Sequence, residues 1–170
     1  MPAQSTRQLP GQVDEECGEK MIVSAHTGGV LVPDLLVAKR QHLKALREDH
    51  EQLQDRHRFL LSPAGAGTVT IRHVRFGRFV EPLRKAEGSA VYDNIRFQGP
   101  VLLEDEQLRE SRNRWEIRRR GDFCQIQLAG TPYVLGLTHP DHTDSWVTLL
   151  DPWWSMDRLW LVHDLPGAQE

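Results

Sequence analysis

The sequence has little cysteine, and its apolar runs are short. Only Cys17 and Cys124 occur in 170 residues, one in a polar N-terminal stretch and one in an apolar run, so we expect no disulfide between them. Sparse cysteine is typical of a reducing compartment. No run approaches the roughly 20 apolar residues of a membrane-spanning helix, and the first residues lack the apolar core of a signal peptide. These absences predict a cytoplasmic protein without a membrane partner.

The sequence motifs of common enzymes are also missing. It has no Gly-rich phosphate loop, no nucleophile elbow and no Cys-x-x-Cys pair, which favours a protein that is not an enzyme and needs no cofactor. The net charge of −3 argues against a surface built throughout for nucleic acid. With 39% hydrophobic and 26% charged residues, the chain has an ordinary globular composition.

The stretch from Pro33 to Leu61 has the clearest periodicity in the chain. Its leucines recur at spacings of seven, three, seven and seven, with two histidines between them: Leu36, Leu43, Leu46, His50, Leu53, His57 and Leu60. This spacing places them on one face of an α-helix of about eight turns. Pro33 suits the first turn of a helix, and Pro63 favours an end near Leu61. We therefore predict a long amphipathic helix.

The rest of the chain divides around this helix. Residues 1–19 are polar and predict a disordered tail. Residues 20–62 would form a small hairpin and the helix, and the Ala-Gly stretch in 63–67 a flexible connection. Residues 68–166 alternate apolar and polar residues between turn signals, which is typical of antiparallel strands. The predicted fold class is α+β, with one long helix followed by a mostly antiparallel sheet or small barrel. The sequence shows no internal repeat.

A surface on the helix is the first candidate for binding a partner. Leu43, Leu46, His50, Leu53 and His57 would form a seam that docks on a partner helix or covers the protein's own sheet. The charges beside the seam do not match for a parallel dimer, so an antiparallel or offset pairing is favoured. The leading hypothesis is therefore a non-enzymatic protein–protein interaction or assembly module, self-associating through the helix.

Two adjacent tryptophans are the second candidate. Trp153 and Trp154 follow Asp151-Pro152, a turn signal, and cannot both point inward from one strand. One of them would be an exposed anchor for a partner, since tryptophan is enriched at interaction hot spots. The alternative is that both cover the open end of a barrel.

An arginine-rich stretch suggests a second function. Residues 109–120 contain six arginines and two glutamates. Arg114, Arg118, Arg119 and Arg120 could bind the phosphates of a nucleic acid, or could be a solvated face of a strand. The alternative function is thus a nucleic-acid-binding protein.

A histidine-rich loop suggests a third function. His139, Asp141 and His142 are metal-binding residue types close together in sequence. The string Thr138–His142 is similar to the second half of the His-x-His-x-Asp-His motif of metallo-β-lactamase-type hydrolases, with Leu137 where the first histidine would stand. This resemblance implies a metal-dependent hydrolase, whereas the residues by themselves favour a polar turn, in which Asp and Pro shape the backbone locally.

Overall fold

The computed structural model describes residues 17–33, 43–47, 55–77, 79–82, 100–103, 113–142 and 144–165. Within these residues the chain forms twelve strands and one short 3₁₀ turn, η3 (Met156–Arg158). The strands are β1 (Gly18–Ser24), β2 (Val30–Pro33), β3 (Leu43–Leu46), β4 (Phe59–Gly65), β5 (Thr68–His73), β6 (Phe79–Pro82), β7 (Pro100–Leu103), β8 (Arg114–Arg120), β9 (Phe123–Leu128), β10 (Val134–Leu137), β11 (Asp144–Leu150) and β12 (Trp160–Asp164).

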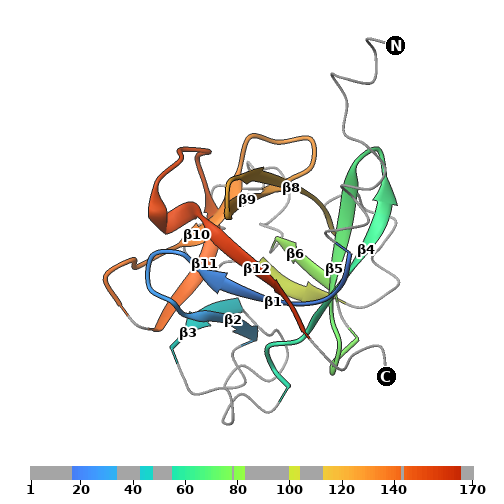
Figure 1. Cartoon of the computed structure of the whole chain (residues 1–170), viewed down its shortest axis with the longest axis horizontal. Coiled ribbons are helices and arrows are strands. Elements are labelled where there is room, and N and C mark those ends of the chain that lie inside the picture. The colour runs from blue at the N-terminus through green and yellow to red at the C-terminus, as the bar shows by residue number, and fades with distance from the viewer. Residues whose placement is uncertain are drawn as a thin grey trace, which may run out of the picture.

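Six of these strands close into a barrel. Going round it, β1 pairs with β4, β4 with β5, β5 with β8, β8 with β9, β9 with β12, and β12 again with β1, all antiparallel. The first and last strands therefore lie side by side, as the blue and red arrows in Figure 1 show. Closure leaves this ring without a free edge that could pair with another chain.

The other six strands form three hairpins, and the whole pairing pattern repeats three times. β2 pairs with β3, β6 with β7, and β10 with β11. Each hairpin is joined to the barrel through the strand before it, because β1 pairs with β2, β5 with β6, and β9 with β10. Four strands thus make one structural repeat, and three repeats make the described fold.

Three buried aromatic residues occupy equivalent places in these repeats. Each of them lies opposite one residue in each of two strands. In the first strand of its own repeat, this is the residue four positions before the end. In the first strand of the next repeat, it is the last residue. Phe59 lies opposite Lys20 and His73, Trp115 opposite Val69 and Leu128, and Trp160 opposite Cys124 and Ser24. These three are also the largest fully buried side chains among the described residues.

The two tryptophans are fastened in matching ways. Trp115 Nε1 donates a hydrogen bond to the Val80 carbonyl in β6 (3.1 Å), and Trp160 Nε1 donates one to the Leu135 carbonyl in β10 (3.0 Å). A buried indole N–H needs such an acceptor. The core is thus built around one aromatic ring from each repeat.

The predicted long helix is wrong. Residues 43–46 form strand β3, which pairs with β2 and β11, residues 55–57 form a turn, and β4 begins at Phe59. Residues 34–42 and 48–54 lie outside the described part of the chain. The described fold is nearly all β, so the α+β class is wrong as well. In β3 the buried residues Leu43 and Ala45 alternate with Lys44, which is the period of a strand.

The expected antiparallel β-structure is present and begins earlier than predicted. The small hairpin expected within residues 20–62 consists of β1 and β2, and Gly18 and Glu19 already belong to β1. Residues 63–67 form the end of β4 and the turn into β5. Residues 1–16 lie outside the described part. Within that part, no helix has both the length and the apolar character needed to cross a membrane.

Candidate functional site

The loop between β11 and β12 carries the exposed large hydrophobic side chains of the described structure. Trp153 is 68% exposed, Met156 43% and Trp154 37%, and the other large hydrophobic side chains of the described residues are less exposed than these. We call residues 151–158 the tryptophan loop. Scattered single hydrophobic residues on a surface need no explanation, whereas a cluster of them marks a candidate interaction site.

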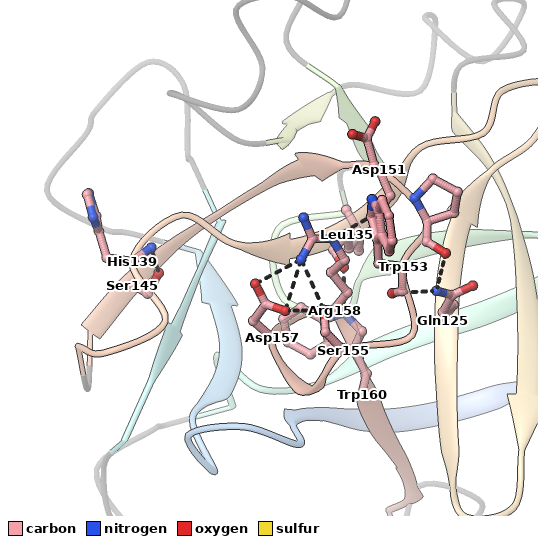
Figure 2. A network of polar contacts seen from close by, with 11 residues as sticks. Gln125, Leu135, His139, Ser145, Asp151, Trp153, Ser155, Asp157, Arg158 and Trp160 are labelled. Carbon is pink, nitrogen blue, oxygen red and sulfur yellow. Dashed lines mark hydrogen bonds and ion pairs between the residues drawn. The ribbon is translucent and has the colours of Figure 1, made fainter.

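A buried glutamine holds this loop in place. Gln125 in β9 is 1% exposed, and its Nε2 donates hydrogen bonds to the carbonyl oxygens of Pro152 (3.3 Å) and Trp153 (3.1 Å). Figure 2 shows both bonds at the point where the loop crosses the strand. Both N–H groups of the amide are used, so the backbone that carries Trp153 is fixed although its ring is exposed.

An arginine fastens the other end of the loop. Arg158 Nε donates to the Asp151 carbonyl (2.8 Å), and its Nη1 lies 3.0 Å from each carboxylate oxygen of Asp157 and 3.1 Å from Ser155 Oγ. Gly136 in β10 lets this cluster approach, because a Cβ at that position would lie 3.2 Å from Arg158 Cγ. The loop is therefore preorganised, which lowers the ordering cost of binding.

Two charged groups beside the tryptophans remain available to a ligand. The guanidinium of Arg120 lies over the Trp154 ring, 3.9 Å from its centroid, in cation–π geometry. The exposed Asp151 precedes Trp153 by two residues, and its side chain points away from the Arg158 cluster in Figure 2. Among the described residues, neither the Asp151 carboxylate nor the Arg120 guanidinium has an ion-pair partner.

The predicted arginine patch divides between two faces of β8. Arg114, Arg118 and Arg120 share the outer face, opposite the face on which Trp115 is buried. Arg119 lies on the opposite face of the strand. The pKa of Asp164 is lowered first by a hydrogen bond from Lys20 and by that ammonium's charge, with a smaller contribution from Arg119. The predicted arginine and tryptophan sites therefore meet at one contact, Arg120 on Trp154.

The described residues of the predicted helix seam do not form a shared surface. Leu43 is fully buried in the core, and Leu46 packs on a smaller cluster around Val30 and Val32. His57 lies half-buried in a turn. His50 and Leu53 lie outside the described residues.

The predicted metal-binding loop brings its two imidazoles together. The rings of His139 and His142 stack with centroids 5.2 Å apart, and the His142 N–H donates to the His139 carbonyl (3.0 Å). Asp141 between them is exposed. Within the described residues, no three side chains of His, Cys, Asp or Glu gather closely enough to hold a metal ion. The metal site remains a prediction.

The sequence reasoning missed Gln125, Asp151 and Arg158 as members of the site. Gln125 alternates with Cys124 and Ile126, a pattern that indicates a side chain facing solvent. The loop that buries it comes from 27 residues further along the chain. The Asp-Pro pair before the tryptophans was the one local signal for a turn at this place.

Comparisons with known proteins identify the fold. No family model matches the sequence, and no curated protein is similar to it in sequence. Among solved structures, the designed three-fold symmetric protein ThreeFoil superposes with a TM-score of 0.70 at 12% identity, covering 87% of this chain and 99% of that one.

Two further solved structures, a lectin and an agglutinin, are similar in structure. The ricin B-like lectin of Macrolepiota procera, solved with lactose, has a TM-score of 0.66 at 14% identity and covers 86% of this chain and 95% of the lectin. The agglutinin of Rhizoctonia solani has a TM-score of 0.64 at 17% identity and covers 94% and 99%. With its six-stranded barrel and three hairpins, the chain has a β-trefoil fold.

Proposed function

We propose that this protein is a non-enzymatic carbohydrate-binding module whose contact surface is the tryptophan loop. The observation that carries the proposal is Trp153, which is 68% exposed on a backbone fixed by the buried Gln125. A large apolar ring that is held out into solvent loses little conformational freedom on binding. The β-trefoil lectin solved with lactose supports the ligand class.

The side chains around Trp153 provide the contacts that a sugar needs. One face of a pyranose ring presents C–H groups and packs on a flat indole, while its hydroxyl groups need donors and acceptors. The Asp151 carboxylate is a charged acceptor for hydroxyl groups, and the guanidinium of Arg120 is a donor. Asp151 lies two residues before Trp153, and Arg120 lies over the neighbouring Trp154, so a sugar on this loop would have polar partners of both kinds nearby.

A glycan array followed by calorimetry tests the proposal. We expect the intact chain to bind one or more oligosaccharides, and Trp153→Ala to weaken the best of them by about tenfold or more, since aromatic anchors dominate binding energy. Met156→Ala removes another exposed side chain of the same loop and should change affinity by less than about twofold, since most contacts around a hot spot are near-neutral. Absence of any bound glycan would contradict the proposal.

A protein partner is the second candidate for the same surface. Met156 and Trp153 are exposed on one loop, and clustered exposed hydrophobic residues also mark protein interfaces. If the loop mediated self-association, the sedimentation coefficient would rise with protein concentration, and Trp153→Ala would abolish that rise. A concentration-independent monomer would exclude the homo-oligomer that the sequence suggested.

Nucleic-acid binding and metal-dependent hydrolysis remain predictions from the sequence. For nucleic acid, the outer-face residues Arg114, Arg118 and Arg120 should give binding to an arbitrary oligonucleotide that falls steeply with salt. For the metal, calorimetric titration of Zn²⁺ should show uptake that is lost in His139→Ala. The cytoplasmic location also remains a prediction.

A further inference from the structure

We infer that the tryptophan loop and the β8 residues Arg118 and Arg120 together select a sugar that carries a carboxylate. This inference rests on the proposed carbohydrate-binding function and narrows its ligand class from sugars in general to acidic sugars. It is carried by the contact of Arg120 with Trp154 and by the place of Arg118 on the same face of β8.

Arg120 is placed where it can bind a carboxylate. The central carbon of its guanidinium lies over the Trp154 ring, 3.9 Å from the ring centroid, in cation–π geometry. A guanidinium held in this way can donate two parallel hydrogen bonds to one carboxylate. Trp154 is itself 37% exposed, so the stack borders solvent and a ligand can reach its edge.

Arg118 adds a second cation on the same face. It lies directly opposite Gln125, the residue that holds Pro152 and Trp153, and the Cβ atoms of such a pair are about 5 Å apart. Arg118 Nη1 donates to Gln127 Oε1 (2.7 Å), which positions the side chain without neutralising it. Neither arginine is paired with an acid among the described residues.

Because acidic residues lie near these arginines, a carboxylated ligand would be selected by direct contact. Asp122 in the turn after β8 and Asp151 in the tryptophan loop are exposed, and Glu116 shares the outer face with Arg118. Together these acids offset the long-range field of the arginines. Selection must therefore come from hydrogen bonds between Arg120 and a ligand carboxylate, and not from a general attraction of anions.

A set of matched ligands and variants tests this inference. The probes are lactose, 3′-sialyllactose, 6′-sialyllactose, the methyl esters of both sialyllactoses, and a glucuronate-terminated disaccharide, measured by calorimetry on the full chain. We expect at least one carboxylated sugar to bind about tenfold more tightly than its uncharged counterpart, the size of a charge-assisted hydrogen bond.

Two arginine variants distinguish a direct contact between Arg120 and the carboxylate from a general effect of the positive charge on this face. Arg120→Gln keeps an aliphatic stem near Trp154 and removes the cation, so the preference for the carboxylated sugar should fall to about twofold or less. Arg114→Gln changes a residue on the same face of the same strand, about 20 Å away at the strand spacing, and should leave the preference unchanged. Thermal unfolding of both variants checks that they are folded.

Each other outcome overturns a different claim. Equal binding of acidic and uncharged sugars would overturn the inference and leave the proposed function standing. An equal loss of the preference for the carboxylated sugar in Arg114→Gln and Arg120→Gln would overturn the inference. It would indicate a general basic face, such as one for nucleic acid. Binding of none of these probes together with an empty glycan array would overturn the proposed function as well.

Discussion

His73 at the end of β5 is held neutral by its surroundings. Its side chain is fully buried, Nε2 donates to the Arg56 carbonyl (2.9 Å), and Nδ1 accepts the Phe76 N–H (3.2 Å). Because both ring nitrogens are already used, a second proton would break the bond from Phe76. The pKa of His73 is lowered to about 4, mainly by burial; the hydrogen bond to the Arg56 carbonyl opposes this shift, and the charges of Arg75 and His57 add to it.

This histidine should make the protein less stable in mild acid. The unfolded chain binds the proton with a pKa near 6.5 and the folded chain only near 4, so the contribution of His73 is complete above pH 6.5 and is lost as the pH falls toward 4. By pH 5 the loss is about 2 kcal/mol.

Urea unfolding at pH 7 and pH 5 measures this effect. The drop in unfolding free energy between the two pH values should be smaller in His73→Gln than in the wild type, by about the same 2 kcal/mol. His163→Gln changes an exposed histidine of β12 and serves as the control. A drop in His73→Gln as large as that of the wild type would mean that other groups cause the acid sensitivity.

At the scale of elements, the tryptophan loop depends on one strand residue. Gln125 supplies both donors for the loop carbonyls, whereas Gln127, two residues along the same face, donates to the Thr131 carbonyl (2.6 Å) in another turn. The two glutamines therefore form a matched pair for mutation, because each holds a different loop by the same chemistry.

Gln125→Ala should loosen the tryptophan loop specifically. Two carbonyl groups lose their donor, so we expect a loss of about 1–3 kcal/mol in unfolding free energy, faster amide hydrogen exchange at residues 153–158, and weaker glycan binding. Gln127→Ala should instead raise exchange around residues 129–133 and leave the tryptophan loop unchanged. Equal exchange in the tryptophan loop of both variants would show that Gln125 is not its anchor.

Some elements could be predicted from the sequence and others could not, for physical reasons. The β8–β9 hairpin was predictable because its alternation is local and because Gly121 supplies the positive φ (+65°) of its turn. The helix was wrongly predicted because β3 has only four residues, too few to show the alternation of apolar and polar residues that is typical of a strand. In addition, Leu43 and Leu46 are spaced from the leucines before and after β3 as they would be on one face of a helix. The two tryptophans of the candidate site stand out in the sequence, whereas Gln125 depends on a packing contact between distant segments.

At the scale of the molecule, threefold repetition is visible in the pairing and hidden in the sequence. Phe59, Trp115 and Trp160 occupy one place in the three repeats, yet the residues differ and the chain between the first two is longer than between the last two. A sequence search for a repeat needs a fixed period and similar residues. The barrel needs only a large apolar ring at each place, so the repeats could diverge.

Because the barrel is closed, we predict that the described chain unfolds in one step. The sequence had instead suggested an N-terminal part that a flexible connection separates from the β-rich part. Phe59→Ala should lower the unfolding free energy by about 3–5 kcal/mol, as removal of a buried aromatic ring does. All five tryptophans lie from Trp115 onward, so their fluorescence reports the second and third repeats, while far-UV circular dichroism reports the whole chain. In Phe59→Ala, both signals should shift to the same lower urea midpoint, because β4 is bonded to β1 and β5 within one ring.

Trp115→Phe and Trp160→Phe provide the matched comparison for this prediction. Each keeps a ring in the core and leaves one buried carbonyl, of Val80 or Leu135, without its indole donor. We expect the two variants to lose similar amounts of unfolding free energy, about 1–3 kcal/mol. Their fluorescence and circular dichroism transitions should again coincide. A fluorescence midpoint unchanged in Phe59→Ala while circular dichroism shifts would mean that the first repeat unfolds by itself. The barrel would then be an assembly of separable parts, and the aromatic layer would not couple the three repeats.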